Sequence, residues 1–153
     1  MRPTPARRRL RDGLERGQAL VEFSLVIVPF IVLLMGVIDL GRGIYMMNGT
    51  SEAAREIARA TTVHVADSSG NLGFSTQTQG VIDTQRNLIP DLTIDPATDI
   101  VCVDEYDVVL PDDACDPGAF IKVRVTAPFS PITPLVSAFG THTFESTSRM
   151  EIP

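Results

Sequence analysis

The most constraining feature of this sequence is an apolar run near its N-terminus. Residues 23–38 are sixteen consecutive positions without Asp, Glu, Lys or Arg, and the wider segment 18–40 is 23 residues long. A helix needs about 20 such residues to cross a bilayer. A buried core helix is the alternative, but a chain of 153 residues has little else to wrap around it. The run therefore predicts a transmembrane helix over residues 18–41.

The charges on the two sides of this run are unequal. Residues 1–17 hold six Arg and two acidic residues, a net charge of +4, whereas the remainder holds 7 basic and 17 acidic groups, a net charge of −10. Arg-rich flanks of membrane helices stay in the cytoplasm. We therefore expect residues 1–17 to form a basic cytoplasmic leader and the C-terminal part to be exported. The acidic balance of that part argues against nucleic-acid binding.

A secretory signal peptide also combines a basic start with an apolar stretch. Two features argue against one here. The apolar run is longer than the usual stretch of about 7–15 residues, and no Ala-x-Ala-like cleavage site follows it. The chain instead continues with Asp39-Leu40-Gly41-Arg42-Gly43. An uncleaved single-pass anchor is one interpretation that this pattern leaves open.

Helical spacing continues beyond the membrane, over residues 42–66, which we expect to form a stalk. Glu52 and Arg55, and Glu56 and Arg59, are i,i+3 pairs on its solvent side. Gly49 weakens this helix without ending it, and Pro29 is expected to kink or locally melt the membrane half. The apolar positions expected on one stripe are Ile44, Met47, Ala54, Ile57, Ala58 and Val65.

Residues 67–153 are expected to be an exported α+β domain. The predicted elements are a loop at 67–80, a short helix at 81–89 that packs Val81, Ile82, Leu88 and Ile89 on the stalk, strands at 99–110, 119–127 and 141–152, and a loop or short helix at 128–140. The first two strands should pair antiparallel. The predicted fold is α+β: a long transmembrane helix continues as an amphipathic stalk and packs on a small antiparallel sheet of about three strands.

The exported region contains two cysteines, Cys102 and Cys115. In an oxidising compartment two such cysteines most simply form one disulfide. A two-Cys metal site lacks further ligands, because His64 and His142 are far away in sequence. Carboxylates that could bind calcium surround the cysteines, but their spacing does not match an EF-hand loop and favours a solvated acidic hairpin. These carboxylates are Asp104, Glu105, Asp107, Asp112, Asp113 and Asp116.

No catalytic pattern is found in the sequence. It has no Gly-rich phosphate loop, no His-Glu-x-x-His pattern and no Gly-x-Ser-x-Gly elbow. Either cysteine could serve as a nucleophile, but two cysteines in an exported domain more often pair. We therefore predict a protein that is not an enzyme and that holds no metal or cofactor.

One charged residue, Glu22, lies near the start of the apolar run. A carboxylate in a membrane helix costs about 2.5–3.5 kcal/mol on insertion scales and is a functional hypothesis by default. The stretch "G-QALV-EF", from Gly17 to Phe23, resembles the processing region of type IV prepilins. That resemblance implies cleavage after Gly17 by a prepilin peptidase, a new ammonium on Gln18, and assembly through Glu22 and Phe23. The alternative is that the Glu22 carboxylate lies among the cytoplasmic headgroups and reaches back to water.

A second resemblance covers more of the chain, roughly residues 16–65 and 119–152. Three segments look like the TadE family: "GQALVEFSLVIVPFIVLLMGVIDLGR", "NGTSEAAREIARATTV" and "VRVTAPFSPITPL". One of the features that carry this resemblance is the acidic residue just before "LGR", which is Asp39 here. Members of that family are small pilin-like components of the Flp (tight adherence) pilus system. The resemblance implies a minor pilin or pseudopilin of the bacterial cytoplasmic membrane, or of an extracellular pilus. Its partners would be other pilin-like subunits, the assembly machinery and the prepilin peptidase.

Two functions of different kinds therefore follow from the sequence. The first is a membrane-anchored, pilin-like component of an Flp-type pilus. The second is an uncleaved, single-pass exported domain that binds a partner or a surface outside a pilus. They differ in whether the chain is processed at Gly17 and depends on Glu22.

Overall fold

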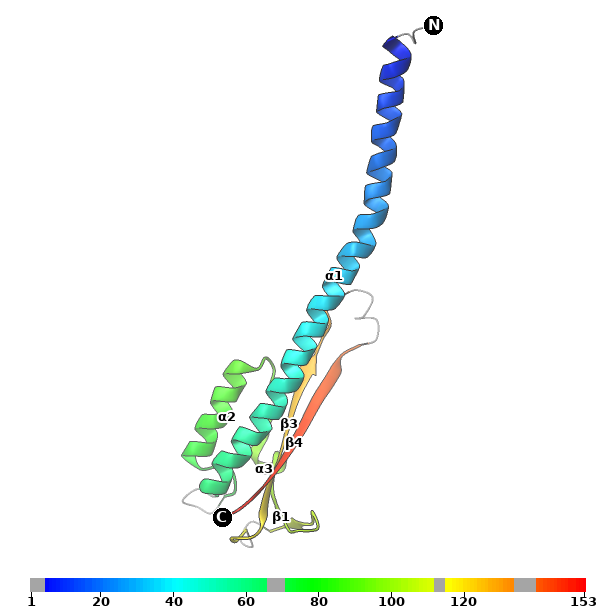
Figure 1. Cartoon of the computed structure of the whole chain (residues 1–153). Helices are drawn as coiled ribbons and strands as arrows, with labels where there is room; N and C mark the ends of the chain where they lie inside the picture. The colour runs from blue at the N-terminus through cyan, green and yellow to red at the C-terminus, as the bar shows by residue number, and fades with distance from the viewer. Residues whose placement is uncertain (1–4, 66–70, 112–114, 134–139) are drawn as a thin grey trace.

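The computed structural model describes residues 5–65, 71–111, 115–133 and 140–153 (Figure 1). It contains one long helix, two shorter helices and a four-stranded antiparallel sheet. Parts of the predicted loops at 67–80 and 128–140 lie outside these residues. Asp112 and Asp113, two of the candidate calcium ligands, lie outside them as well.

The long helix α1 runs from Pro5 to Val63 over 59 residues. It therefore begins well before the predicted start at residue 18 and ends three residues before the predicted end at 66. Proline is tolerated in the first turn, where its missing N–H has no intrahelical partner. The helix continues through Pro29, so the predicted local melting does not occur. Figure 1 shows its N-terminal half projecting away from every other element.

The C-terminal half of α1 packs on the sheet through a stripe of mostly small side chains. Two predicted members of this stripe, Ile44 and Met47, are instead 52% and 61% exposed. Both side chains lie at the start of the packed half, beside the ends of β3 and β4. The predicted ion pairs from Glu52 to Arg55 and from Glu56 to Arg59 are present. The buried apolar residues of the stripe are Met46, Ala53, Ala54, Ile57 and Ala58.

The sheet has the strand order β2-β1-β3-β4, and every neighbouring pair is antiparallel. Its strands are β1 (Ile100–Val103), β2 (Val109–Leu110), β3 (Phe120–Phe129) and β4 (His142–Glu151). The α+β prediction is confirmed, with one strand more than expected. α1 packs on β3 and β4. β3 pairs with β1 on one side and along its whole length with β4 on the other.

The additional strand arises because the predicted strand at 99–110 turns back on itself. The Asp104 carboxylate accepts hydrogen bonds from the backbone N–H groups of Tyr106 and Val108, at 2.8 and 2.9 Å. Asp107 adopts a left-handed backbone conformation with φ of 67°, which Asp tolerates better than most residues. A side-chain-capped turn of this kind replaces the strand at residues 104–108.

The alternation predicted for the two long strands is confirmed. The side chains of Ile121, Val123 and Val125 are fully buried against the helical layer. β3 continues two residues beyond its predicted end, because Pro128 and Phe129 pair with Thr143 and His142. Pro128 lies beyond the part of β3 that pairs with β1, so its missing N–H removes no bond from that pair. On β4 the half-buried positions are the predicted Phe144, Ser146, Ser148 and Met150.

Helix α2 (Thr76–Leu88) begins five residues before the predicted start at 81, inside the predicted loop. Ser75 caps it, because its hydroxyl accepts a hydrogen bond from the Thr78 N–H at 3.2 Å. Ile82 and Ile89 are buried as predicted, whereas Leu88 is 57% exposed and does not pack on the stalk. A one-turn helix, α3 (Pro96–Asp99), follows and leads into β1.

Gly49 of α1 permits a close approach between the long helix and the end of α2. A Cβ atom built at this position would lie 3.2 Å from two side-chain atoms of Ile89. The residue that was expected only to weaken the helix therefore has a packing function.

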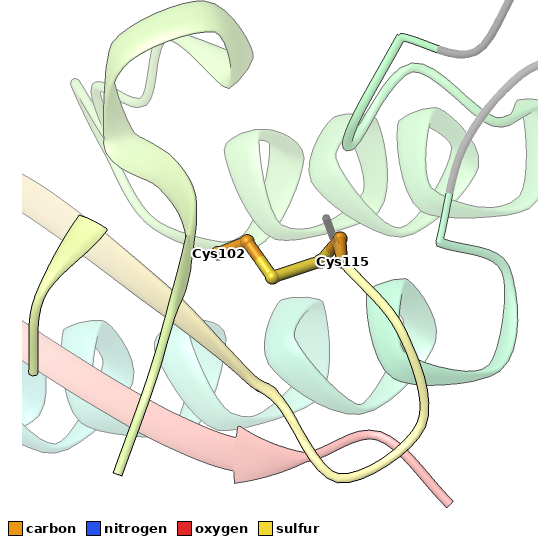
Figure 2. The surroundings of a disulfide bond; sticks show 2 residues. All are labelled: Cys102 and Cys115. Atoms are coloured by element: carbon orange, nitrogen blue, oxygen red, sulfur yellow. A yellow bond between two sulfur atoms is a disulfide. The ribbon is translucent and has the colours of Figure 1, made fainter. Parts of the chain in front are cut away.

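The two cysteines form the predicted disulfide (Figure 2). Their Cα atoms are 5.8 Å apart, within the usual range for such a bond. Cys102 is fully buried on β1, and Cys115 lies in the connector that precedes β3. The bond therefore holds the β2–β3 connector against the core.

We predict that removal of this bond lowers stability without affecting membrane insertion. The bond joins residues 13 positions apart. The loop-entropy relation gives about 3 kcal/mol for a closed loop of this size. The double variant Cys102→Ala/Cys115→Ala should lower the free energy of unfolding by roughly that amount in detergent. Membrane extraction should be unchanged, because insertion depends on another segment. Reaction of both native thiols with a maleimide under non-reducing, denaturing conditions would show that the bond is absent.

Candidate functional site

The first part of the candidate site is the half of α1 that projects from the domain, residues 17–38, which we call the free half. Within the described part of the chain one helix, Gly17–Val63, is long and apolar enough to cross a membrane, with a mean hydropathy of 2.6 over its most apolar window. None of that window is buried inside the protein, which excludes the buried core helix considered above. An apolar surface of this size on a water-soluble monomer would be exceptional. The single N-terminal helix therefore fits a single-pass membrane protein.

The predicted processing and assembly residues all lie on this free half. Gly17, Gln18, Glu22 and Phe23 are exposed, and a Cβ atom built at Gly17 would have no described neighbour within 4 Å. The helix is continuous through Gly17, so residues on both sides of the predicted cleavage point belong to one element. Gln18 and Glu22 are four residues apart and so share one helix face. Glu22 makes no hydrogen bond or ion pair with any residue whose placement is described.

The second part of the site is a carboxylate cluster at the junction of the two halves of α1. Asp39 is only 5% exposed, and its side chain meets the segment that follows β3. Its Oδ1 accepts the N–H of Ile132 at 3.0 Å, and its Oδ2 accepts the N–H and the hydroxyl of Thr133 at 2.7 and 2.6 Å. Three donors thus converge on one buried carboxylate, an arrangement that suits the ionised form.

Arg42 completes this cluster one turn further along the helix. Its Nη1 lies 3.2 Å from Asp39 Oδ1 and also donates to the carbonyl oxygen of Ser130 at 3.4 Å. The guanidinium carbon lies 5.4 Å from the centroid of the Phe129 ring, which is within cation–π range. Asp39 and Arg42 together therefore fix the segment 130–133 to the helix.

We name Asp39, Arg42, Ser130, Ile132 and Thr133 the junction cluster. Asp39 belongs to a segment that resembles the TadE family, but the sequence pattern indicated no partner for it. Ile132 and Thr133 lie 93 and 94 positions away in the chain, so no local pattern could connect them to it. The available signal was an acidic residue at the end of an apolar run, a position that demands a partner.

The acidic hairpin uses its carboxylates for structure. Asp104 caps the β1–β2 turn, and Asp107 forms an ion pair with Lys122 of β3. Among the described residues, no group of three or more His, Cys, Asp or Glu side chains is arranged to hold a metal ion. The calcium alternative therefore finds no support in this part of the chain.

Two stalk residues outside the apolar run have shifted pKa values. Glu56 and Arg59 form a two-point hydrogen bond, at 2.7 and 3.3 Å, on the solvent side of α1. The hydrogen bond from Arg59 lowers the pKa of Glu56, and the same bond raises the pKa of Arg59. The pair is solvent-exposed, and such pairs contribute little to stability.

We predict that Asp39→Asn loosens the junction. The variant retains the size of the side chain, but its amide group offers one acceptor oxygen to three donors and no charge to Arg42. Hydrogen bonds to a charged group contribute about 1.5–3 kcal/mol each, so amide exchange at Ile132 and Thr133 should accelerate by at least tenfold. Exchange in the rest of β3 should change much less.

The matched control for this measurement is Glu56→Gln on the same helix. Because Glu56 pairs at the surface, its loss should change stability by less than about 1 kcal/mol. Unchanged exchange at Thr133 in Asp39→Asn would mean that the carboxylate does not hold the segment.

Comparison with known proteins gives one match. The family model described as TadE-like protein matches residues 17–59, which include Gly17, Glu22, Asp39 and Arg42. No curated protein and no solved structure matches the chain. The C-terminal stretch 119–152, which also contributed to the predicted resemblance, lies outside the matched residues.

The match and the free apolar helix together fit a membrane protein related to the Tad pilus. The family is pilus-related and non-enzymatic, in agreement with the lack of a catalytic pattern in the sequence. Over residues 17–59 the chain is similar to the TadE-like family, and this match agrees with the predicted resemblance in that part of the chain.

Proposed function

We propose that this chain is a minor pilin or assembly component of an Flp/Tad-type pilus, anchored in the bacterial cytoplasmic membrane and processed by a prepilin peptidase. The observation that carries the proposal is the TadE-like match over a helix whose apolar half is not covered by any of the described residues. A helix of this kind has to be covered by lipid before assembly and by lipid or other helices after it. The exported domain remains attached through the packed half of the same helix.

The proposed processing site is Gly17. Cleavage after Gly17 would remove the basic leader, residues 1–17, and leave a free ammonium on Gln18. Two consequences support this assignment on physical grounds. The leader's net charge of +4 would no longer hold the helix end at the cytoplasmic face. The new ammonium would in addition offer a cationic partner to a carboxylate at the same depth.

The proposed assembly residue is Glu22, with Phe23 beside it. The Glu22 carboxylate has no partner in the described part of its own chain, so a partner has to come from water, from the processed terminus or from a neighbouring subunit. The ammonium of the same chain would lie one turn away, and that of a neighbour becomes accessible when helices pack side by side. An ion pair removed from water offsets part of the desolvation of both groups.

The first prediction of this proposal concerns cleavage after Gly17. In cells that carry the matching peptidase, the mature protein should begin at Gln18, as determined by N-terminal sequencing and intact mass. Gly17→Leu should block cleavage because its side chain is bulky, while the matched control Gly17→Ala should retain cleavage. A mature terminus at Met1 or Arg2 would instead favour the uncleaved anchor that binds a partner outside a pilus.

The second prediction concerns the incorporation of the protein into the assembly. Glu22→Gln keeps the size of the side chain and removes its charge, so an ammonium that paired with Glu22 would be left unpaired. Breaking a buried ion pair in this way costs about 3–5 kcal/mol. Incorporation, measured by crosslinking or co-purification of assembled material, should therefore fall more than tenfold, with expression and topology unchanged.

The control is Glu52→Gln, which removes an exposed stalk carboxylate paired with Arg55. It should leave incorporation unaltered, because a surface pair contributes little. Equal incorporation of Glu22→Gln and the parent would refute the pairing. It would also support a carboxylate that lies among the cytoplasmic headgroups.

A further inference from the structure

An apolar groove lies beside the junction cluster, between α1 and the ends of β3 and β4. Its volume is about 640 Å³, and its α1 side is lined by residues that include Leu40, Ile44 and Met47. Phe129 and Phe144 form its sheet side, with their ring centroids 5.7 Å apart. The side chains of Ile44 and Met47, which the sequence predicted to pack on the sheet, are the ones left exposed at its edge.

The depth of this groove follows from the length of the helix. Counted from Gln18, a hydrocarbon core of about 30 Å takes roughly 20 helical residues at about 1.5 Å each. The outer boundary of the hydrocarbon would therefore fall close to Asp39. The groove begins at Gly36 and ends at Met47, so it extends over roughly 16 Å of helix at about 1.5 Å per residue. It crosses the level of the outer lipid headgroups.

The segment that the junction cluster holds lies at the same level. Ile132 donates its N–H to Asp39, which places it at the depth of that carboxylate, yet its side chain is 61% exposed. A large apolar side chain is thus held outward at the level where hydrocarbon gives way to headgroups. Tyr45, an amphipathic side chain suited to this interface, is exposed six residues beyond Asp39, which is nearly two helical turns.

We propose that the groove and Ile132 form a lipid-binding surface, on which the exported domain rests against the outer leaflet of the membrane. The occupant of the groove is an acyl chain of an outer-leaflet phospholipid. This inference rests on the proposed membrane anchoring of α1. It adds a second contact with the membrane, made by the sheet domain.

Two observations favour a phospholipid over a second copy of the chain. The Gly36 end of the groove is continuous with the bare helix surface, which acyl chains cover if the helix spans the membrane. Arg42 lies next to the groove, because it contacts Asp39 and the Phe129 ring, which both line it. Its two hydrogen bonds use Nη1, so Nη2 and Nε have no acceptor among the described residues. At headgroup depth a guanidinium pairs well with phosphate. An apolar groove with a neighbouring cation matches the two ends of a phospholipid.

The sequence offers a direct test because it contains no tryptophan. The full-length protein is reconstituted as single-Trp variants into phosphatidylcholine–phosphatidylglycerol vesicles whose acyl chains carry bromine, a short-range quencher of indole emission. Ile132→Trp reports the proposed surface, and Ile44→Trp is a second reporter at the groove. Val28→Trp reports the membrane span itself. Tyr106→Trp, at an 83% exposed position on the β1–β2 turn, is the distal control.

We expect Ile132→Trp and Ile44→Trp to lose most of their emission to bromine near the carbonyl end of the acyl chain, and less to bromine near the methyl end. Val28→Trp should show the opposite order, and Tyr106→Trp should not be quenched by either lipid. A blue-shifted but unquenched Ile132→Trp and Ile44→Trp would show that protein, such as a second copy, covers the surface, and would overturn the proposal. Water-like emission from both reporters would overturn it equally.

The Val28→Trp variant separates this inference from the proposed function. If Val28→Trp is quenched and the two groove reporters are not, the anchor is correct and the lipid-binding surface is wrong. If Val28→Trp is itself unquenched, the helix does not span the bilayer, and both the anchoring and the surface are refuted.

Discussion

The Asp39 carboxylate lies where the exposed apolar part of α1 meets the part of the helix that packs on the sheet. On its N-terminal side α1 is bare and apolar, and on its C-terminal side the same helix is covered by the sheet. Without a tie at this point the domain would be held to the helix only by packing that begins near Met46. Two backbone N–H groups and one hydroxyl converge on the carboxylate instead, so the β3–β4 end of the sheet is fixed where the apolar surface starts. The carboxylate thus adds a polar contact to the apolar packing that holds the domain on the helix.

The packing below this junction depends on small side chains. Ala53, Ala54 and Ala58 bring the backbone of α1 close to β3 and β4, and Gly49 does the same for the end of α2. Close approach lets Ile57 fill the space against the alternating Ile and Val side chains of β3. A compact core of this kind is sufficient for a small domain only with additional constraints, and the disulfide supplies one of them.

Sequence patterns predicted the elements that local periodicity determines. The membrane half of the helix followed from the length of its apolar run, its stalk half from 3.6-residue spacing, and the two long strands from alternation; the helical turns before residue 18 were not predicted. The missed features depend on single side-chain contacts, such as the Ser75 cap that starts α2 early and the Asp104 turn that divides one strand into two. The Cys102–Cys115 bond could be predicted because two cysteines in an exported domain leave one intrachain pairing. The contact of Asp39 with Thr133 could not, since it joins residues 94 positions apart.

The two carboxylates at the ends of the apolar run show what the candidate site requires. Asp39, at the C-terminal end, accepts hydrogen bonds from Ile132 and Thr133 of its own chain. Glu22, at the N-terminal end, has the same need if the helix spans a membrane, because an ionised carboxylate in or near hydrocarbon is costly without a partner. No described residue forms a hydrogen bond or an ion pair with the Glu22 side chain. The carboxylate at one end of the apolar run therefore has its hydrogen-bond partners in the described chain, and the carboxylate at the other end does not. Under the proposed function, the partners open to Glu22 are water at the headgroups, a processed terminus and another subunit.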